Sequence, residues 1–205
     1  MNVENDKNTT DKSEQVKNGD DNNNFTPDHA RKLTSYTDKF MCRVKDNTFK
    51  INFLLFRVRD LESNQLLFEV ASESTDNNND DTQDEEEDDE KRVIKYHLGP
   101  DFLELTSLGS TLRFSVGDNP VKNFLMIEKH YFKNKLVKAY EFLFDFCIPN
   151  SVNEWETMYT IPSLSEEDKE EMRGAPWQTR SDTFYFVENK LVMHHKAIYN
   201  YSDFE

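Results

Sequence analysis

The chain has 205 residues, a formal net charge of −15 and a hydrophobic content of 36%, and it is rich in rings, with sixteen Phe, eight Tyr and two Trp. This length suits one sandwich or barrel of about 150 residues plus a tail. The charge excludes nucleic acid and anionic lipid surfaces as direct partners, because no Lys/Arg cluster could follow phosphates, and it favours a partner that carries Lys or Arg.

Residues 1–30 are predicted to form a disordered polar tail, because they contain seven Asn and only isolated apolar side chains. Residue 2 is Asn, no apolar signal segment follows, and no apolar run approaches the roughly 18 residues of a membrane span. We therefore expect a soluble, cytoplasmic protein. In that compartment Cys42 and Cys147, which are far apart in the sequence, are expected to be reduced thiols.

Residues 31–205 are expected to form one domain, opening with a short helix or an adherent arm at 28–40. A slip of the apolar phase near Leu54 and Leu55 predicts a bulge, or a strand that is buried on both faces. Ser165 followed by acidic residues predicts a helix over 165–172. Alternating apolar residues predict strands at 49–59, 66–70, 92–98, 111–116, 124–132, 135–148, 182–187 and 191–201, the last two joined as a hairpin. Eight or nine antiparallel strands with one or two short helices predict an all-β fold, a β-sandwich.

The segment 76–90 is strongly acidic, with ten Asp or Glu among its fifteen residues. Its oxygen-bearing side chains match several positions of a calcium-binding EF-hand loop, but Asp81 occupies the position of the turn-forming Gly and no helix flanks the segment. A tract this acidic produces such matches by chance. We therefore interpret it as a flexible, solvated loop that would contact a basic partner, with calcium binding as the alternative.

No catalytic motif is recognisable in the sequence, and we predict no enzymatic activity, no cofactor and no metal site. His194 and His195 are adjacent, but neighbouring side chains of a strand point to opposite faces, so one ion cannot bind both. Glu128 and His130, in contrast, share one face of a predicted strand with apolar side chains such as Phe124. A carboxylate there is costly unless it is paired, so we expect Glu128 to interact with His130.

Several long runs of sequence resemble a known family. They include FSVGD-x-PV-x-NF, IE-x-HYF, SD-x-FYFV and LVMH, and the similarity extends in order over residues 40–203. These runs are similar to the GMP phosphodiesterase delta-subunit family, and most of all to its "uncoordinated" (retinal protein four) branch of myristoyl-binding lipid chaperones. The resemblance implies an immunoglobulin-like β-sandwich with a hydrophobic lipid tunnel between its sheets.

The resemblance also implies partners and site residues. The partners would be N-myristoylated cargo proteins and an Arf-like small GTPase, whose GTP form binds outside the sandwich and ejects the cargo. The protein would act in the cytoplasm and, in cells that have one, at the cilium or flagellum. Ile161 stands where relatives have Phe, which would widen or shift the inner end of the tunnel. The lipid-binding residues would be Phe56, Tyr96, Phe102, Glu128, His130, Tyr159, Ile161 and Tyr185.

Two alternatives to a myristoyl carrier remain at this point. One is a prenyl-binding carrier of the same fold, since the run CIPNSVNEW is also similar to the delta subunit itself. The other is an immunoglobulin-like interaction module with a filled core, which would bind partners by strand addition at a sheet edge. A module with a filled core would show no lipid-dependent stabilisation, so a thermal-shift measurement would separate it from both carriers.

Overall fold

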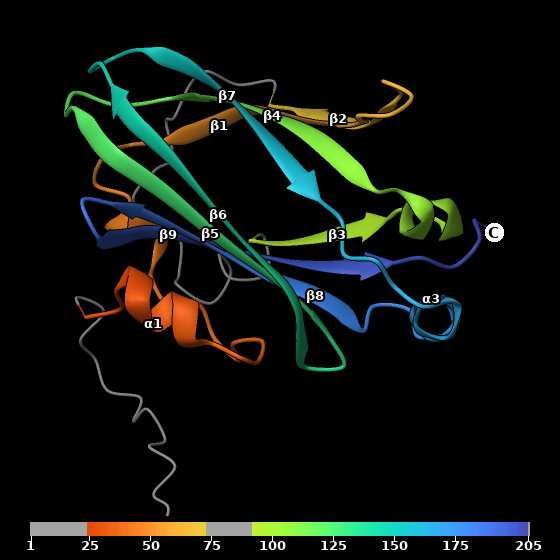
Figure 1. Cartoon of the computed structure of the whole chain (residues 1–205). Coiled ribbons are helices and arrows are strands. Elements are labelled where there is room, and N and C mark those ends of the chain that lie inside the picture. Colours follow the sequence, from red (N-terminus) through yellow and green to blue (C-terminus); the bar gives the residue numbers. More distant parts are fainter. Residues whose placement is uncertain (1–23, 73–91, 205) are drawn as a thin grey trace, which may run out of the picture.

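The computed structural model describes residues 24–72 and 92–204, and nine strands in these ranges form two sheets packed face to face (Figure 1). The four-stranded sheet has the order β2-β1-β4-β7, and the five-stranded sheet has the order β3-β9-β8-β5-β6. The all-β sandwich predicted from the sequence is therefore confirmed. The strands are β1 Asn52–Asp60, β2 Leu66–Ala71, β3 Val93–His97, β4 Ser107–Ser115, β5 Val121–Phe132, β6 Lys135–Cys147, β7 Val152–Thr160, β8 Thr179–Val187 and β9 Lys190–Asn200.

Eight of these strands overlap the predicted ranges, and the phase slip in β1 is a shift of register between Phe53 and Leu55 against β4. Two features were not predicted. Strand β7 was missed, and β3 pairs with β9 in parallel, which corrects the expectation that all strands are antiparallel. The hairpin of β8 and β9 is confirmed, and both of its turn residues, Glu188 and Asn189, have positive φ angles.

The helical elements of the described residues are short, and none is long and apolar enough to cross a bilayer. Ser165 caps α3 as predicted, since its hydroxyl accepts a hydrogen bond of 3.1 Å from the backbone amide of Asp168. The boundary expected at residue 30 falls inside α1, where Ala30 is fully buried, so the part of the chain that packs on the sandwich begins earlier. The elements are α1 Pro27–Lys32, η1 Val44–Asp46, η2 Pro100–Glu104 and α3 Glu166–Arg173. The predicted acidic loop 76–90 lies outside the described residues.

Residues 24–47, which we call the N-terminal arm, cover the outer face of the five-stranded sheet (Figure 1). The buried side chain of Lys129 on β5 fixes the arm, because its ammonium donates to the backbone carbonyls of Arg31 and Leu33, both at 2.6 Å. The adherent arm that the sequence suggested is thus held by its backbone groups as well as by the apolar contacts of Phe25 and Ala30 with the sheet.

A second buried polar group fastens the arm further along. Asp182 on β8 accepts hydrogen bonds from the amide and hydroxyl of Thr37, both at 2.9 Å, and lies 3.3 Å from the ammonium of Lys196. His194 accepts the Met41 amide on Nδ1 at 3.0 Å and has Nε2 3.1 Å from Asp182. Both contacts fit a neutral imidazole that carries its proton on Nε2. The attachment of the arm therefore depends on His194 being neutral.

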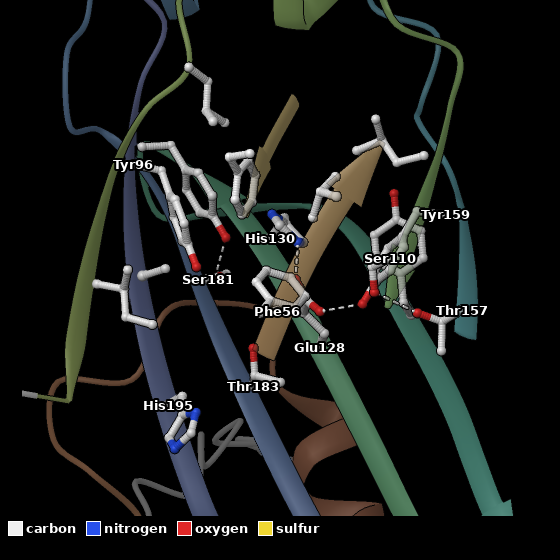
Figure 2. A pocket seen from close by; sticks show the side chains of 18 of the residues that line it. Phe56, Tyr96, Ser110, Glu128, His130, Thr157, Tyr159, Ser181, Thr183 and His195 are labelled. Carbon is white, nitrogen blue, oxygen red and sulfur yellow. Dashed lines mark hydrogen bonds and ion pairs between the residues drawn. The ribbon is translucent and has the colours of Figure 1, made fainter. Parts of the chain in front are cut away.

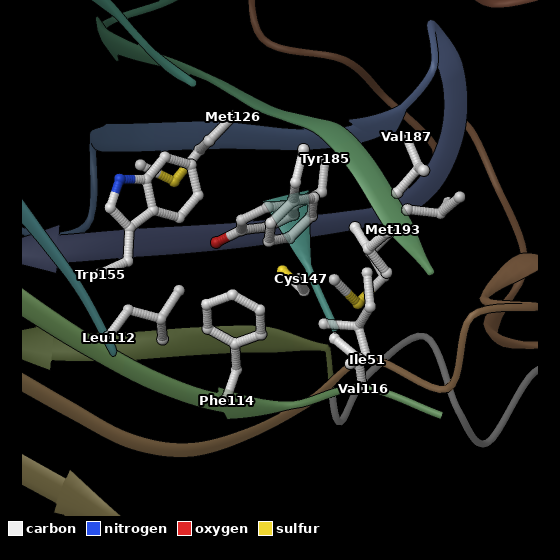
Figure 3. Close-up of a cluster of buried hydrophobic side chains, with 13 residues drawn as sticks. Ile51, Leu112, Phe114, Val116, Met126, Cys147, Trp155, Tyr185, Val187 and Met193 are labelled. Carbon is white, nitrogen blue, oxygen red and sulfur yellow. The ribbon is translucent and has the colours of Figure 1, made fainter. Parts of the chain in front are cut away.

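The main core lies between the sheets at the end where β5 begins and β6 and β8 finish (Figure 3). Phe114 and Phe124 are both completely buried, with ring centroids 5.4 Å apart, and Trp155 packs 5.5 Å from Phe124. Cys147 is a buried thiol in this cluster, whereas Cys42 is a buried thiol in the arm. Rings fill this end of the sandwich. A cavity lies toward the other end.

Candidate functional site

A cavity of about 410 Å³ lies between the two sheets (Figure 2). This volume falls within the roughly 300–1,000 Å³ of ligand-binding pockets, and the wall is mainly apolar and aromatic. Both sheets contribute to it, through the inward-pointing residues of their alternating strands. All eight residues named from the sequence line this cavity: Phe56, Tyr96, Phe102, Glu128, His130, Tyr159, Ile161 and Tyr185.

Aromatic contacts close the two seams where the sheets meet. On one side the rings form a chain from β1 to β9, with Phe56, Phe68, Tyr96 and Tyr199 at successive centroid distances of 5.7, 5.2 and 5.5 Å. On the other side the Tyr159 ring of β7 lies 4.7 Å from Tyr140 and 5.0 Å from Phe142, both on β6. The walls of the cavity are therefore built from large, rigid and weakly polar aromatic rings.

Glu128 is the centre of a hydrogen-bonded group on the wall. Its carboxylate oxygens lie 2.6 Å from Nε2 of His130 and 3.0 Å from the hydroxyl of Tyr159, which donates to it from the facing sheet (Figure 2). The Glu128 side chain is only 14% exposed and that of His130 23%, so both groups are largely withdrawn from water. The expected interaction of Glu128 with His130 is thus present, and Tyr159 joins it.

The charge of Glu128 acts on the surrounding phenols. Burial raises the pKa of Tyr159 well above its usual value, and the negative charge of Glu128 raises it further. Burial and then the same charge raise the pKa values of Tyr96 and Tyr140 to about 12. These phenols are consequently protonated at neutral pH and able to donate a hydrogen bond. The arrangement can hold a ligand that is mostly apolar and carries a hydrogen-bonding group near Glu128.

Several polar cavity residues were not named from the sequence. Ser110 and Thr157 bond to each other at 2.9 Å across β4 and β7. Thr183 and His195 lie opposite each other on β8 and β9 (Figure 2). Alternation was the available signal, since Thr183 shares its face with the predicted residue Tyr185. The sequence indicated His195 only as one of two adjacent histidines and did not predict that it lines a cavity.

His194 and His195 do point to opposite faces, as the sequence argument requires. His194 is completely buried beneath the arm, whereas His195 lines the cavity. Across the described ranges 24–72 and 92–204, no group of three or more His, Cys, Asp or Glu side chains could hold a metal ion. The EF-hand-like match in 76–90 falls outside these ranges.

Comparison with known proteins gives consistent results. Residues 45–201 match the family model described as GMP-PDE, delta subunit. Protein unc-119 homolog B of Mus musculus is 49% identical over 179 residues, which cover 86% of this chain and 71% of the mouse protein. Protein unc-119 homolog B-B of Xenopus laevis is 44% identical over 180 residues, covering 88% and 75%. Protein unc-119 of Caenorhabditis elegans is 42% identical over 179 residues, covering 87% and 80%.

Proposed function

Because this chain belongs to the GMP phosphodiesterase delta-subunit family, we propose that it is a lipid-binding chaperone that extracts, solubilises and traffics N-myristoylated proteins. The family is non-catalytic, in line with the absence of a catalytic motif from the sequence. The observation that carries the proposal is the apolar cavity between the sheets, with one hydrogen-bonded carboxylate on its wall. A fatty acyl chain joined to a peptide by an amide has the same distribution of polarity.

The energetics support transfer from a membrane without covalent chemistry. A myristoyl chain of about 14 carbons gains about 10 kcal/mol on full burial, at roughly 0.8 kcal/mol per CH₂, while its hold on a bilayer is marginal. A preformed apolar cavity therefore competes with the bilayer for the chain. The open cavity also argues against the alternative of an interaction module with a filled core.

The residues of the wall have distinct proposed roles. The rings of Phe56, Tyr96 and Phe102 contact the acyl chain, and Ile161 and Tyr185 extend this apolar surface. Glu128 accepts a hydrogen bond from the amide N–H that links the acyl group to glycine, because each of its oxygens keeps acceptor capacity beside its present partner. His130 and Tyr159 hold the carboxylate in place for this contact.

Release of the cargo needs a change in the cavity, since affinity alone would keep an acyl chain bound. A partner that binds one state of the sandwich more tightly than another supplies such a change. We propose, from the family resemblance, that this partner is an Arf-like small GTPase in its GTP form, acting in the cytoplasm and at the cilium or flagellum of cells that have one.

The test is calorimetric titration with an N-myristoylated glycine peptide and its unacylated twin. Burying even half of the chain is worth about 5 kcal/mol, or roughly three to four decades of affinity, so only the acylated peptide should bind. Ala197→Phe, which fills the cavity from β9, should abolish binding, and Ala139→Phe on an exposed position of β6 is the matched control. Equal binding of the two peptides would refute the proposal. A farnesylated peptide that binds better would identify a prenyl carrier.

A further inference from the structure

Lys138 is a cavity residue to which the proposed function gives no role. It lies on β6, an edge strand of the five-stranded sheet, and is half-buried at the wall of the cavity. Among the described residues that line the cavity, the only Lys or Arg side chains are Lys138 and Lys196. The ammonium of Lys196 is used on the outer face, where it donates to the carbonyl of Thr37 and lies 3.3 Å from Asp182. Lys138 therefore supplies the cation that is available at the cavity.

The ammonium of Lys138 has no acidic partner. In residues 24–72 and 92–204, no carboxylate oxygen lies within 4.0 Å of it. It lies instead 5.8 Å from the centre of the Tyr140 ring. That ring is 5.8 Å from the imidazole of His130 and 4.7 Å from the ring of Tyr159, and both of these residues are hydrogen-bonded to Glu128. A cation without an acid thus lies beside the Glu128 group.

The strand register sets the spacing between Lys138 and Glu128. Lys138 lies directly opposite His130, and Glu128 lies opposite Tyr140, so Glu128 and Lys138 are diagonal neighbours. Both line the cavity. Diagonal positions of two paired strands are about 7–8 Å apart, a distance that long side chains can reach across. A negative and a positive group therefore stand side by side on one wall without pairing with each other.

A ligand that carries an amide N–H and a carboxylate close together fits these two groups. In an N-acylglycine the carboxylate carbon is about 2.5 Å from the amide nitrogen, because only Cα lies between them. With a hydrogen bond of about 2.9 Å at each end, such a ligand spans roughly 6–8 Å between a Glu oxygen and a Lys nitrogen. This span suits the diagonal spacing, and the acyl chain of the same ligand suits the apolar cavity.

We propose that Lys138 binds a carboxylate next to the acyl amide, and that the cavity therefore takes N-acyl amino acids in addition to acylated proteins. This inference rests on the proposed function, in which the amide lies at Glu128. The amide N–H donates to Glu128 and the carboxylate accepts from Lys138, so each end of the ligand meets a charged group. An ion pair at a half-buried site is worth about fivefold in affinity. An acidic residue directly after the acylated glycine of a protein is the second source of such a carboxylate.

The experiment measures dissociation constants for two pairs of ligands that differ in one negative charge. The first pair is N-myristoylglycine and N-myristoylglycinamide, and the second is a myristoyl-Gly-Asp peptide and its myristoyl-Gly-Asn counterpart. In Lys138→Met the affinity for N-myristoylglycine relative to its amide should fall about fivefold from the wild-type ratio. Lys138→Arg keeps the charge and should keep the ratio. Lys135→Met is the matched control, because Lys135 is exposed on the same strand and does not line the cavity.

Three results would overturn the inference. The first is a fall of less than threefold in Lys138→Met, and the second is an equal fall in Lys135→Met, which would make the net charge of the protein the cause. The third is a fall confined to the Asp and Asn peptides, which would assign the carboxylate to protein cargo alone. Each ratio is taken within one variant, so a change in the folded fraction cancels. Failure of the proposed function is distinguishable, because the wild-type protein would then bind N-myristoylglycine no better than N-acetylglycine.

Discussion

Replacing Glu128 with Gln separates a role in ligand recognition from a purely structural one at nearly constant side-chain volume. Both carboxylate oxygens already have a partner, His130 at 2.6 Å and Tyr159 at 3.0 Å, and Gln can keep both contacts by orienting its oxygen and its amide group. What the substitution removes is the negative charge. The effect on an incoming N–H donor is therefore isolated from the effect on packing.

The magnitude follows from the burial of the site. Hydrogen bonds to charged groups contribute about 1.5–3 kcal/mol and neutral ones about 0.5–1.5 kcal/mol, so the change is about 1–1.5 kcal/mol. With Glu128 only 14% exposed, water screens little of it. We expect Glu128→Gln to bind a myristoylated glycine peptide about tenfold more weakly. Free myristate, which has no amide N–H and carries its own negative charge, should bind the variant as well as or better than the wild type.

Titration calorimetry with both ligands measures this contrast, and urea unfolding checks that the variant is folded. Tyr159→Phe is the control that removes one hydrogen bond to the carboxylate but keeps the charge, and it should weaken peptide binding less than Glu128→Gln does. If both ligands bind Glu128→Gln as they bind the wild type, Glu128 stabilises the strand and the amide lies elsewhere in the cavity.

Three further predictions concern the wall, the acidic segment and the arm. Phe114→Ala should lower the free energy of unfolding by about 3–5 kcal/mol, because Phe114 is completely buried. Phe56→Ala and Tyr96→Ala, at the cavity, should lower the free energy of unfolding less but weaken acyl-peptide binding more. Urea titrations that give all three variants the same loss of stability, with unchanged binding, would contradict this. Deleting residues 76–90, which contain no apolar side chain, should leave folding and lipid binding intact. The deletion should weaken the binding of cargo that has basic residues after the acylated glycine, and this binding should become less sensitive to salt. An unfolded deletion variant, or a calcium-dependent rise in Tm of the intact chain alone, would contradict this. Asp182→Asn should cost about 3–5 kcal/mol, because it removes the negative charge that is paired with the buried ammonium of Lys196. Burial lowers the pKa of His194; burial alone would raise the pKa of Asp182, but the hydrogen bond from His194 lowers it. Stability should therefore be full above about pH 6.5 and decline as the pH falls from there, with the Asp182 contribution lost below about pH 4. Urea midpoints that do not depend on pH would refute this.

The sequence predicted the strands whose apolar residues occupy one face. Strand β7 was missed because its apolar residues are divided between the faces: Trp155 and Tyr159 point inward with polar neighbours, while Val152 and Met158 are exposed. Period-two alternation is then absent. The parallel pairing of β3 with β9 was also beyond prediction, because side chains alternate in the same way in parallel and antiparallel strands.

The candidate site was accessible from the sequence to a limited extent. The pairing of Glu128 with His130 follows from their spacing on one strand, but Tyr159 reaches the carboxylate from the missed strand of the other sheet. The position of the N-terminal arm depends on backbone groups that bond to Lys129 and Asp182. Such contacts leave no apolar pattern in the arm, and only the three-dimensional arrangement shows them.

The β8–β9 hairpin has a consequence for how the protein folds. Its strands alternate between groups for the arm (Asp182, His194) and groups for the cavity (Thr183, His195). A shift of one residue in pairing would exchange the two sets and turn charged side chains into the apolar interior. The positive φ angles of the turn and the bulge after Tyr185 oppose such a shift. A misaligned nascent chain would therefore lose both its arm and its lipid site at once, and that shared penalty selects the correct alignment during folding.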